Sequence, residues 1–400
     1  MLRIVSDLPL KSNSYEMVER KGIGHPDTIC DAIAERASAL YSQYFLNKFG
    51  KLAHHWFDKV MLVGGESLIA YGKGVLVSPY KVIFAGKCVK RFAGEDIPVI
   101  EIFTKAANEV LSSVLRGFDS QKDLLILDET VDYQGSSRKG GRYRPQSIND
   151  LVDPEDENRV SNDCNLVCAY APLSVVEDIV LQVEKSMTIG NLKKEFPMLG
   201  TDIKIVGFCE NGKYKLLVNA PFLASQIFSY EQYIQLSNKL VENISEFIRD
   251  RYQLVCEIEF NPSDRENKPY LTSLGSAADT GDVGVVGRGN RINGLITLKR
   301  CMSIEAPAGK NPIDHTGKLY AIAARRIADL LYEKMGIPVE VSIYVSKSTP
   351  IKEPNEVVIN LQTTSVTNKE KELVELIVNS QLENICSITL ELIQKGIVLW

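Results

Sequence analysis

The chain has 400 residues, of which 44% are hydrophobic and 24% charged; the composition is typical of globular proteins, and the length predicts two or three domains or repeated modules. Its net charge of -5 argues against general nucleic-acid binding, although a local basic pocket for a polyanion remains open. No apolar run reaches membrane-spanning length, no signal-peptide core follows Met1, and the eight cysteines lack zinc-site spacing. We therefore expect a cytoplasmic protein with free thiols that binds neither nucleic acid nor membranes.

Apolar residues at helical spacing over 26–47 predict the first helix, and Pro26 suits its first position because proline lacks a backbone N–H. Asn211-Gly212 predicts a type I′ turn in a hairpin over 202–222. The other expected elements are helices that begin at the Ser174–Glu177 and Ser229–Gln232 capping boxes, helices over 102–116, 319–335 and 368–394, and strands over 60–65, 80–85, 123–128, 254–260, 270–274 and 339–346.

Strands therefore come in twos and threes between single helices, unlike the strict alternation that produces a doubly wound parallel sheet. This grouping predicts an α+β fold built from modules of the split βαβ type. Residues 132–158 are polar, rich in glycine and arginine and then acidic, and we interpret them as one long exposed segment.

Gly22-Ile23-Gly24-His25-Pro26-Asp27 is the first candidate for a functional motif. It places a histidine at a helix start, with Asp27 and Asp31 one turn apart on the same face. Like charges at this spacing repel; a helix N-terminus partly offsets the repulsion, and a bound cation would offset it better. An ordinary glycine turn with acidic residues in the first turn is the alternative interpretation of this segment.

Two glycine-rich segments follow later in the chain. In the first, residues 282–291, glycines let backbone N–H groups approach an anion, and Arg288 and Arg291 supply charge and bidentate hydrogen bonds. In the second, residues 308–318, Lys310 precedes a predicted helix, as in a phosphate cradle, but the P-loop pattern is absent. Solvated surface turns are the alternative for both segments.

Weaker candidates complete the set. Asp202 and Lys204 share one face of a strand, which is also common on exposed strands. Asp163 follows Asn162 and is usual for a turn, and Asp58 with His54 and His55 could bind a metal or lie at the edge of a core. Together the motifs offer a histidine, carboxylates and cations on glycine loops, which a polyphosphate with a divalent metal requires.

In this order the motifs resemble the archaeal-type S-adenosylmethionine synthetases (methionine adenosyltransferases). The matching runs lie between about residues 15 and 345, and the C-terminal part matches weakly. They are Glu19-Arg20-Lys21-Gly22-Ile23-Gly24-His25-Pro26-Asp27, Val63-Gly64-Gly65, Gln134-Gly135-Ser136, Tyr170-Ala171-Pro172-Leu173-Ser174, Gly287-Arg288-Gly289-Asn290-Arg291-Ile292-Asn293-Gly294-Leu295-Ile296-Thr297 and Gly309-Lys310-Asn311-Pro312.

The resemblance implies three ferredoxin-like modules per subunit, with the sheets packed in a homodimer and active sites at the interface. Approximate module boundaries are 1–125, 126–265 and 266–400, with some interleaving. It also implies a transferase of S-adenosylmethionine biosynthesis and one-carbon metabolism. Methionine sulfur attacks C5′ of ATP, and the displaced triphosphate is hydrolysed to phosphate and pyrophosphate. Mg²⁺ and K⁺ are the implied cofactors.

Roles for individual residues follow from the same resemblance. His25 would stabilise the leaving triphosphate, which Lys204, Arg288 and Lys310 would hold together with Arg291 in the glycine loop. Asp27 would hold magnesium, and Asp58 would hold the monovalent cation. The remaining substrate contacts would be Asp163 and Asp282 to the methionine ammonium group, Asp202 to the nucleotide, and Gln134 in the methionine pocket or the lid over it.

Several segments depart from the family pattern. Cys164-Asn165-Leu166-Val167-Cys168-Ala169 replaces Thr-Ser-Phe-Gly-Val-Gly, Trp56-Phe57 replaces Asn-Thr, and Asp314 replaces asparagine; the 276–285 loop also changes. These changes affect the expected methionine and adenine sides more than the triphosphate side. The sequence therefore leaves open a different acceptor (another thioether, amino acid or nucleophile), and a non-catalytic, nucleotide-binding regulatory subunit.

Overall fold

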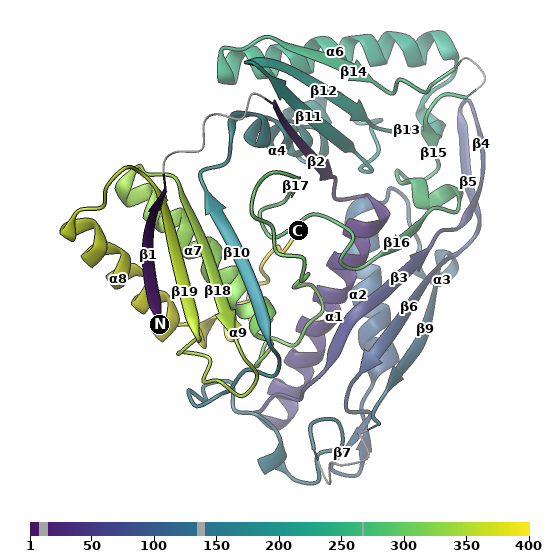
Figure 1. Ribbon diagram of the computed structural model, residues 1–400. Helices are drawn as coiled ribbons and strands as arrows, with labels where there is room; N and C mark the ends of the chain where they lie inside the picture. Colours follow the sequence, from purple (N-terminus) through teal and green to yellow (C-terminus); the bar gives the residue numbers. More distant parts are fainter. Residues whose placement is uncertain (8–14, 134–140, 266–267) are drawn as a thin grey trace.

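The computed structural model describes residues 1–7, 15–133, 141–265 and 268–400, and the α+β class is confirmed (Figure 1). Three mixed sheets dominate the described part of the chain. We name them the N-terminal sheet, in the order β16 (Val283–Val285), β3 (Trp56–Val63), β6 (Tyr80–Lys87), β9 (Leu124–Val131); the central sheet, β14 (Cys256–Phe260), β12 (Lys213–Asn219), β11 (Lys204–Glu210), β2 (Tyr15–Lys21), β17 (Ile296–Thr297); and the C-terminal sheet, β1 (Leu2–Asp7), β19 (Glu356–Gln362), β18 (Val339–Val345), β10 (Asn165–Ala171).

Long helices cover one face of each sheet and bury its alternating apolar residues. They are α1 (Pro26–Phe49) and α2 (Val99–Val114) on the N-terminal sheet, α4 (Val175–Thr188) and α6 (Tyr230–Tyr252) on the central sheet, and α7 (Thr316–Met335) and α8 (Asn368–Glu383) on the C-terminal sheet. The smaller elements are α3 (Ser120–Asp123), α5 (Asn191–Glu195), α9 (Ser387–Gln394) and the paired strands β4 (Glu66–Ala70) with β5 (Lys73–Ser78), β7 (Arg91–Phe92) with β8 (Glu95–Asp96), and β13 (Phe222–Leu223) with β15 (Leu271–Thr272).

All three sheets repeat the same succession of pairings, namely antiparallel, antiparallel and then parallel. The succession runs β16–β3–β6–β9 in the N-terminal sheet, β2–β11–β12–β14 in the central sheet and β10–β18–β19–β1 in the C-terminal sheet. A parallel pair needs a crossover connection, which α2 and α6 provide in the first two sheets. In the C-terminal sheet the parallel partner is instead the first strand of the chain.

The local signals in the sequence explain several element boundaries. The capping box at Ser174 and Glu177 is present at the start of α4, and Ser229 caps α6 through the amide of Gln232. Asn211 and Gly212 have φ values of 49° and 78°, which confirms the predicted type I′ turn between β11 and β12. These predictions depended on backbone chemistry within a few residues, and they hold.

Three expectations differ from the structure. The helix predicted over 368–394 is two helices, α8 and α9, because the chain turns at residues 384–386. Strands β1, β2, β4, β5, β7, β8, β16, β17 and β19 were not predicted. The described part of the 132–158 segment is not wholly exposed, since Tyr143 and Leu151 are buried and Val152 pairs with Leu52.

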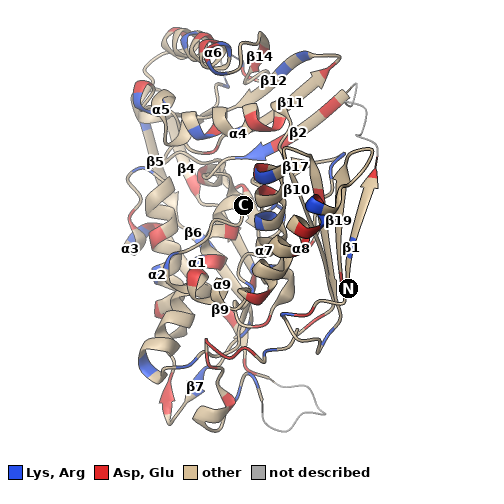
Figure 2. Ribbon diagram, turned by 90° about the vertical axis from the view of Figure 1, so that its left-hand side faces the viewer, with Lys and Arg blue, Asp and Glu red and all other residues tan. Residues whose placement is uncertain are grey.

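Charged residues are interspersed along the helices and strands in Figure 2, with acidic and basic positions alternating on the same elements. Among the described residues, no helix combines the length and apolar character needed to cross a membrane.

Candidate functional site

The turn before α1 packs directly on the segment that leads into β11. The amide of Gly22 donates to the carbonyl of Ile203 (2.6 Å), and the amide of Gly24 donates to the carbonyl of Thr201 (3.0 Å). A Cβ atom at Gly24 would lie 2.1 Å from Oγ1 of Thr201, so a larger residue would separate the two segments. The glycines of the first motif therefore bring the start of β11 beside the start of α1.

His25 is the N-cap of α1, and its Nδ1 accepts a hydrogen bond from the amide of Asp27 (3.1 Å). Burial is the largest cause that lowers the pKa of His25 to about 4; Asp27 and Asp282 oppose it, whereas Lys21 and Lys204 add to it. The imidazole is therefore neutral at pH 7. Because Nδ1 accepts a hydrogen bond, the proton is assigned to Nε2, which can donate to a ligand.

Three carboxylates on successive turns of α1 accept hydrogen bonds from backbone amides of the two glycine loops. These bonds hold the loops against the helix. Asp27 Oδ1 accepts from the amide of Val285 (2.9 Å), Asp31 Oδ1 from Gly287 (2.9 Å), and Glu35 Oε2 from Gly309 (3.0 Å). Burial raises the pKa of Asp31 to about 7. Asp31, whose role the sequence left open, thus positions the first glycine loop, and Glu35, which the sequence did not single out, positions the second.

Lys21 is a further cation at this site. It belongs to the matching run 19–27, but the resemblance implied no role for it. Its Nζ lies 2.8 Å from Asp27 Oδ2 and 2.7 Å from the carbonyl oxygen of Arg288. Burial acts to raise the pKa of Asp27, but the hydrogen bonds from Lys21 and Val285 outweigh burial and hold that pKa below its usual range. Asp27 is therefore an ionised carboxylate that already faces one cation.

The two arginines of the first glycine loop have different surroundings. The guanidinium of Arg291 donates to the carbonyls of Gly287 (2.6 Å), Gly289 (2.8 Å) and Ile304 (3.0 Å), so this side chain braces the loop. The Arg288 side chain is exposed. Lys204, on β11, pairs with Glu19 at 3.2 Å and is 38% exposed.

A second group of predicted residues lines a cleft of about 270 Å³ near the start of α7. Its polar lining includes Asp58, Asp163, Glu305, Lys310 and His315. Lys310 Nζ lies 2.7 Å from Asp58 Oδ2 and 2.6 Å from Glu305 Oε1. Burial acts to raise the pKa of Asp58, but Lys310 outweighs it and holds the pKa below the usual range.

Buried polar atoms without a hydrogen-bond partner among the described residues occur within the cleft and beside it in the chain. They are Asn162 Oδ1, Asn311 Nδ2, Asp314 Oδ1 and His315 Nδ1. The amide of Asn162 donates to the carbonyl of Asp314 (3.2 Å), so the two chain segments are in contact. Because buried polar groups are nearly always hydrogen-bonded, this region is suited to a polar ligand or to water.

Two other predicted residues lie near the α1 end. Asp202 is buried, accepts from the amide of Ala277 (2.7 Å) and has a pKa that burial raises to about 7. Asp282 is exposed and is near enough to His25 to influence its titration. Gln134 lies outside the described residues. Within the described ranges, no group of three or more His, Cys, Asp or Glu side chains is arranged to hold a metal ion.

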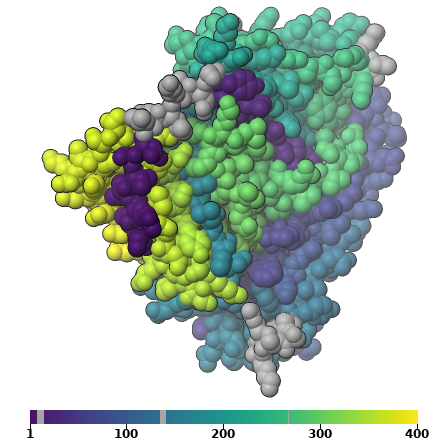
Figure 3. All heavy atoms as spheres, viewed as in Figure 1, coloured from purple at the N-terminus to yellow at the C-terminus, as the bar shows by residue number. Residues whose placement is uncertain are grey.

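Helix α1 connects the two regions. Asp27 and Glu35 are eight residues apart, a rise of about 12 Å along the helix. In Figure 3 the green segment that carries both glycine loops lies on the surface between the yellow C-terminal sheet and the blue N-terminal sheet. The arrangement is an elongated site for an anionic ligand, with a neutral histidine at one end and a lysine-lined polar cleft at the other.

Comparisons with known proteins assign this chain to a family. The model of the S-adenosylmethionine synthetase (AdoMet synthetase) family matches residues 1–396. The S-adenosylmethionine synthase of Thermoplasma volcanium is 34% identical and covers 99% of this chain and 98% of its own length. The S-adenosylmethionine synthase of Methanocaldococcus jannaschii is 36% identical, and the match covers 95% of this chain and 94% of that protein. A solved structure, an unusual S-adenosylmethionine synthetase from Campylobacter jejuni, shares the fold with a TM-score of 0.61 at 15% identity, over 95% of this chain and 90% of that one.

The fold and these comparisons thus define an α+β transferase. The chain belongs to the S-adenosylmethionine synthetase family. Membership makes it a transferase of S-adenosylmethionine biosynthesis, and the family resemblance read from the ordered motifs is confirmed.

Proposed function

We propose that this chain joins ATP to methionine by attack of the methionine sulfur on C5′ of the ribose, with displacement of triphosphate. The displaced triphosphate is then hydrolysed to phosphate and pyrophosphate. The observation that carries the proposal is the convergence of His25, Lys21, Lys204 and the first glycine loop at the start of α1. This is where a leaving polyphosphate would be neutralised.

His25 is the proposed donor to the leaving group. Its neutral imidazole, with the proton on Nε2, would form a hydrogen bond that strengthens as charge develops on the bridging oxygen of ATP. Lys204 and Arg288 would hold the triphosphate at this end of the site and Lys310 at the other, while Arg291 keeps the loop in shape through the three carbonyls that it contacts. Lys21 joins this set as a further cation.

Magnesium fits this end of the site in one respect. The Asp27 carboxylate is ionised, as a ligand of Mg²⁺ must be, although Lys21 Nζ at 2.8 Å compensates its charge and would have to move aside for the ion. Mg²⁺ commonly binds proteins through one or two carboxylates and takes its other ligands from substrate phosphates and water, so a cage of three protein ligands is not needed. When bound, the ion would supply charge neutralisation on the triphosphate.

Potassium fits less well. The proposed ligand Asp58 is paired with Lys310 (2.7 Å) and with Lys59 (2.5 Å), so its negative charge is already compensated by two ammonium groups. We therefore route no step through potassium. The Lys59 side chain is mainly exposed, whereas Lys310 is buried and is the partner of Asp58 inside the cleft.

For the methionine ammonium group we propose Asp282, which lies near His25. Asp163, the second carboxylate that the resemblance implies, lines the polar cleft near α7 at the other end of the site. In that cleft, Asn311 Nδ2 and His315 Nδ1 have no hydrogen-bond partner among the described residues, and we propose that the far end of the triphosphate, or water, completes them. Asp202 and Gln134 keep their proposed roles toward the nucleotide and the methionine pocket.

We also propose a cytoplasmic homodimer of subunits with three ferredoxin-like modules. The repeated pairing succession of the three sheets supports the modules. On the outer face of the N-terminal sheet, Met61, Leu125 and Val283 are 40%, 43% and 45% exposed, and an apolar sheet face of this kind is suited to a second copy. Sedimentation at twice the mass of the chain, lost when Met61 is replaced by lysine, would agree with this proposal.

Incubation of the purified chain with ATP, methionine and Mg²⁺ tests the activity. We expect S-adenosylmethionine, phosphate and pyrophosphate in equal amounts, and almost none with the matched His25→Ala variant. Phosphate and pyrophosphate without a sulfonium product would overturn the methionine assignment in favour of another acceptor. Absence of turnover with ATP and any tested thioether or amino acid would favour the regulatory alternative.

A further inference from the structure

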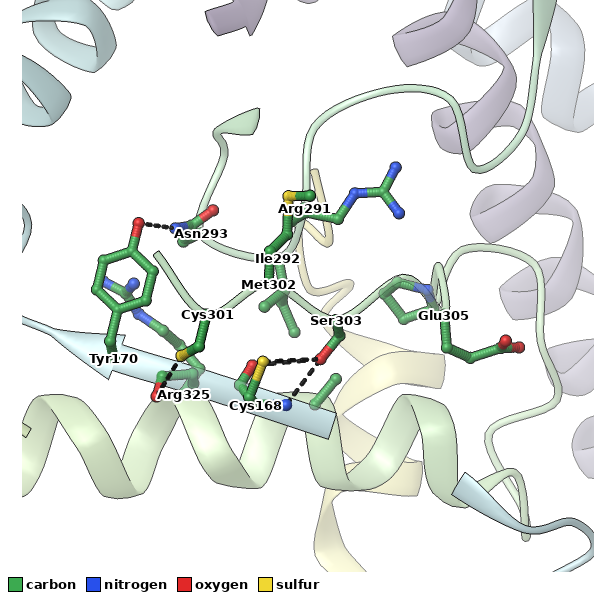
Figure 4. A pocket seen from close by; sticks show the side chains of 13 residues that line it. Cys168, Tyr170, Arg291, Ile292, Asn293, Cys301, Met302, Ser303, Glu305 and Arg325 are labelled. Carbon is green, nitrogen blue, oxygen red and sulfur yellow. Dashed lines mark hydrogen bonds between the residues drawn. The ribbon is translucent and has the colours of Figure 1, made fainter. Parts of the chain in front are cut away.

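Two cysteines outside the proposed reaction line the same small pocket beside β10. Cys168 lies on β10, and Cys301 lies on the segment that connects the two glycine loops. The Cys168 amide donates to Ser303 Oγ (2.8 Å), and Cys301 Sγ donates to the carbonyl of Ala169 (3.6 Å). Both thiols line this pocket, in which Ser303 Oγ also donates to Cys168 Sγ (3.8 Å) (Figure 4).

We propose that Cys168 and Cys301 form a peroxide-sensitive dithiol that closes to an intramolecular disulfide. This modification site is independent of the adenosyl transfer proposed above. Neither residue belongs to the proposed catalytic or substrate-binding set. Cys168 also lies in the 164–169 run, where this chain departs from its family pattern. Transient disulfides of this kind are the type found in reducing compartments.

The surroundings of the two sulfur atoms assign different roles to them. The neighbouring Cys301 side chain is the largest cause that lowers the pKa of Cys168 to about 7; burial and Glu340 oppose it, and Ser303 adds to it. The neighbouring Cys168 and burial raise the pKa of Cys301 above its usual range, although Arg300 acts to lower it. A thiolate is the nucleophilic form of cysteine, so Cys168 is the residue that reacts first and Cys301 is the resolving thiol.

The chemistry balances with hydrogen peroxide as the oxidant. The Cys168 thiolate attacks one peroxide oxygen, the O–O bond breaks, and the products are Cys168 sulfenic acid and hydroxide, which takes up the thiol proton as water. The sulfur of Cys301 then attacks the sulfenyl sulfur, an S–S bond forms, and a second water leaves. Two thiols are oxidised, and one peroxide is reduced to two waters.

The disulfide would tie the connecting segment to β10. This segment includes Ile304, whose carbonyl accepts a hydrogen bond from Arg291, and Glu305, which pairs with Lys310. A thiol reductant would release the segment again. The oxidised and reduced forms thus differ in a covalent link between the C-terminal sheet and the connection between the two glycine loops.

Peptide mapping tests the proposal directly. Trypsin cleaves after Arg159 and Lys185 and after Arg300 and Lys310, so Cys168 and Cys301 fall in separate peptides, 160–185 and 301–310. Since the first peptide also contains Cys164, the experiment uses the full chain with Cys164→Ser. The reduced protein is treated with a small excess of hydrogen peroxide, blocked with N-ethylmaleimide, digested and analysed by mass spectrometry.

We expect a cross-linked pair of these peptides, lighter than their sum by two hydrogen atoms, which dithiothreitol separates. In Cys301→Ser, where Cys168 has no resolving partner, we expect sulfinic acid at Cys168 instead. Sulfinic acid at Cys168 in the parent protein at the same rate as in Cys301→Ser, or both thiols still labelled by N-ethylmaleimide after peroxide, would overturn the proposal. The parent measurement decides even if a variant fails to fold.

Discussion

The two ends of the site differ in how completely their polar groups are satisfied. At the start of α1, His25, Asp27 and Asp31 each accept a hydrogen bond from a backbone amide, and Lys21 neutralises Asp27. In the cleft near α7 and beside it in the chain, Asn162, Asn311, Asp314 and His315 carry buried polar atoms without a partner among the described residues.

This difference indicates that the two ends would bind a ligand in different ways. The α1 end is rigid and charged before any ligand binds, as a site that stabilises developing negative charge should be. The α7 end leaves donors and acceptors open, and a ligand would complete them. Substitutions at the first end should therefore affect the chemical step and stability, and substitutions at the second should affect affinity.

The largest expected effect is at His25. We predict that His25→Ala lowers turnover about 10²- to 10⁴-fold while ATP binding is largely retained, because the lost hydrogen bond acts mainly in the transition state. Initial rates of S-adenosylmethionine formation and ATP binding by calorimetry are the measurements. Since the pKa of His25 is about 4, turnover of the wild type should not fall between pH 8 and pH 6 through protonation of this residue. A variant with unchanged turnover would remove His25 from the mechanism.

Lys310 tests whether the lysine in the cleft binds substrate or merely compensates Asp58. Lys310→Met should lower kcat/KM for ATP about 10²-fold, because a buried cation facing the site is lost. Lys59→Met is the matched control. It removes the other ammonium group that pairs with Asp58, but that side chain is 67% exposed, and we expect less than about a twofold change. Equal losses in the two variants would mean that charge compensation of Asp58 alone matters.

The sequence predicted the α1 end better than the α7 end. The physical reason is the distance along the chain between the residues that interact. Pro26, the N-cap position of His25 and the face shared by Asp27 and Asp31 follow from helix geometry within a few residues. That Asp31 binds the amide of Gly287 could not be predicted, because it depends on packing between segments 256 residues apart.

Long-range pairing also explains the strands that were not predicted. β1 pairs in parallel with β19, so the first residues of the chain complete a sheet whose other strands lie beyond residue 164. Both strands are short, and nothing in their local sequence identifies the partner. The family resemblance supplied candidate residues such as Lys310 and Asp58. Their mutual ion pair and the unpartnered Nδ1 of His315 could be recognised only in the structure.

A substitution of His315 tests whether a ligand completes the unpartnered atoms at the α7 end. We predict that His315→Phe, which keeps an aromatic ring but removes Nδ1, raises KM for ATP about tenfold with little change in the melting temperature. The reason is that Nδ1 has no hydrogen bond to lose in the described structure, and a ligand is its expected partner. Steady-state kinetics and thermal denaturation measure both effects. A large loss of stability with KM unchanged would make His315 a structural residue.

The smallest effect is expected at Asp31, as a dependence of stability on pH. Burial raises its pKa to about 7, whereas an unfolded aspartate titrates near 3.9, so the folded state binds the extra proton between these values. Stability therefore decreases as the pH rises from about 4 to 7, because the buried carboxyl must lose its proton. Asparagine keeps an acceptor for the Gly287 amide but does not titrate.

We thus predict that the melting temperature of Asp31→Asn, relative to the wild type, rises by a few degrees between pH 5 and pH 8. Asp250→Asn, at an exposed position of α6, controls for the loss of one negative charge. A pH-independent difference for Asp31→Asn would mean that Asp31 is ionised throughout. The α1 end would then hold two charged carboxylates one turn apart with Lys21 on only one of them, and would need a cation even without substrate.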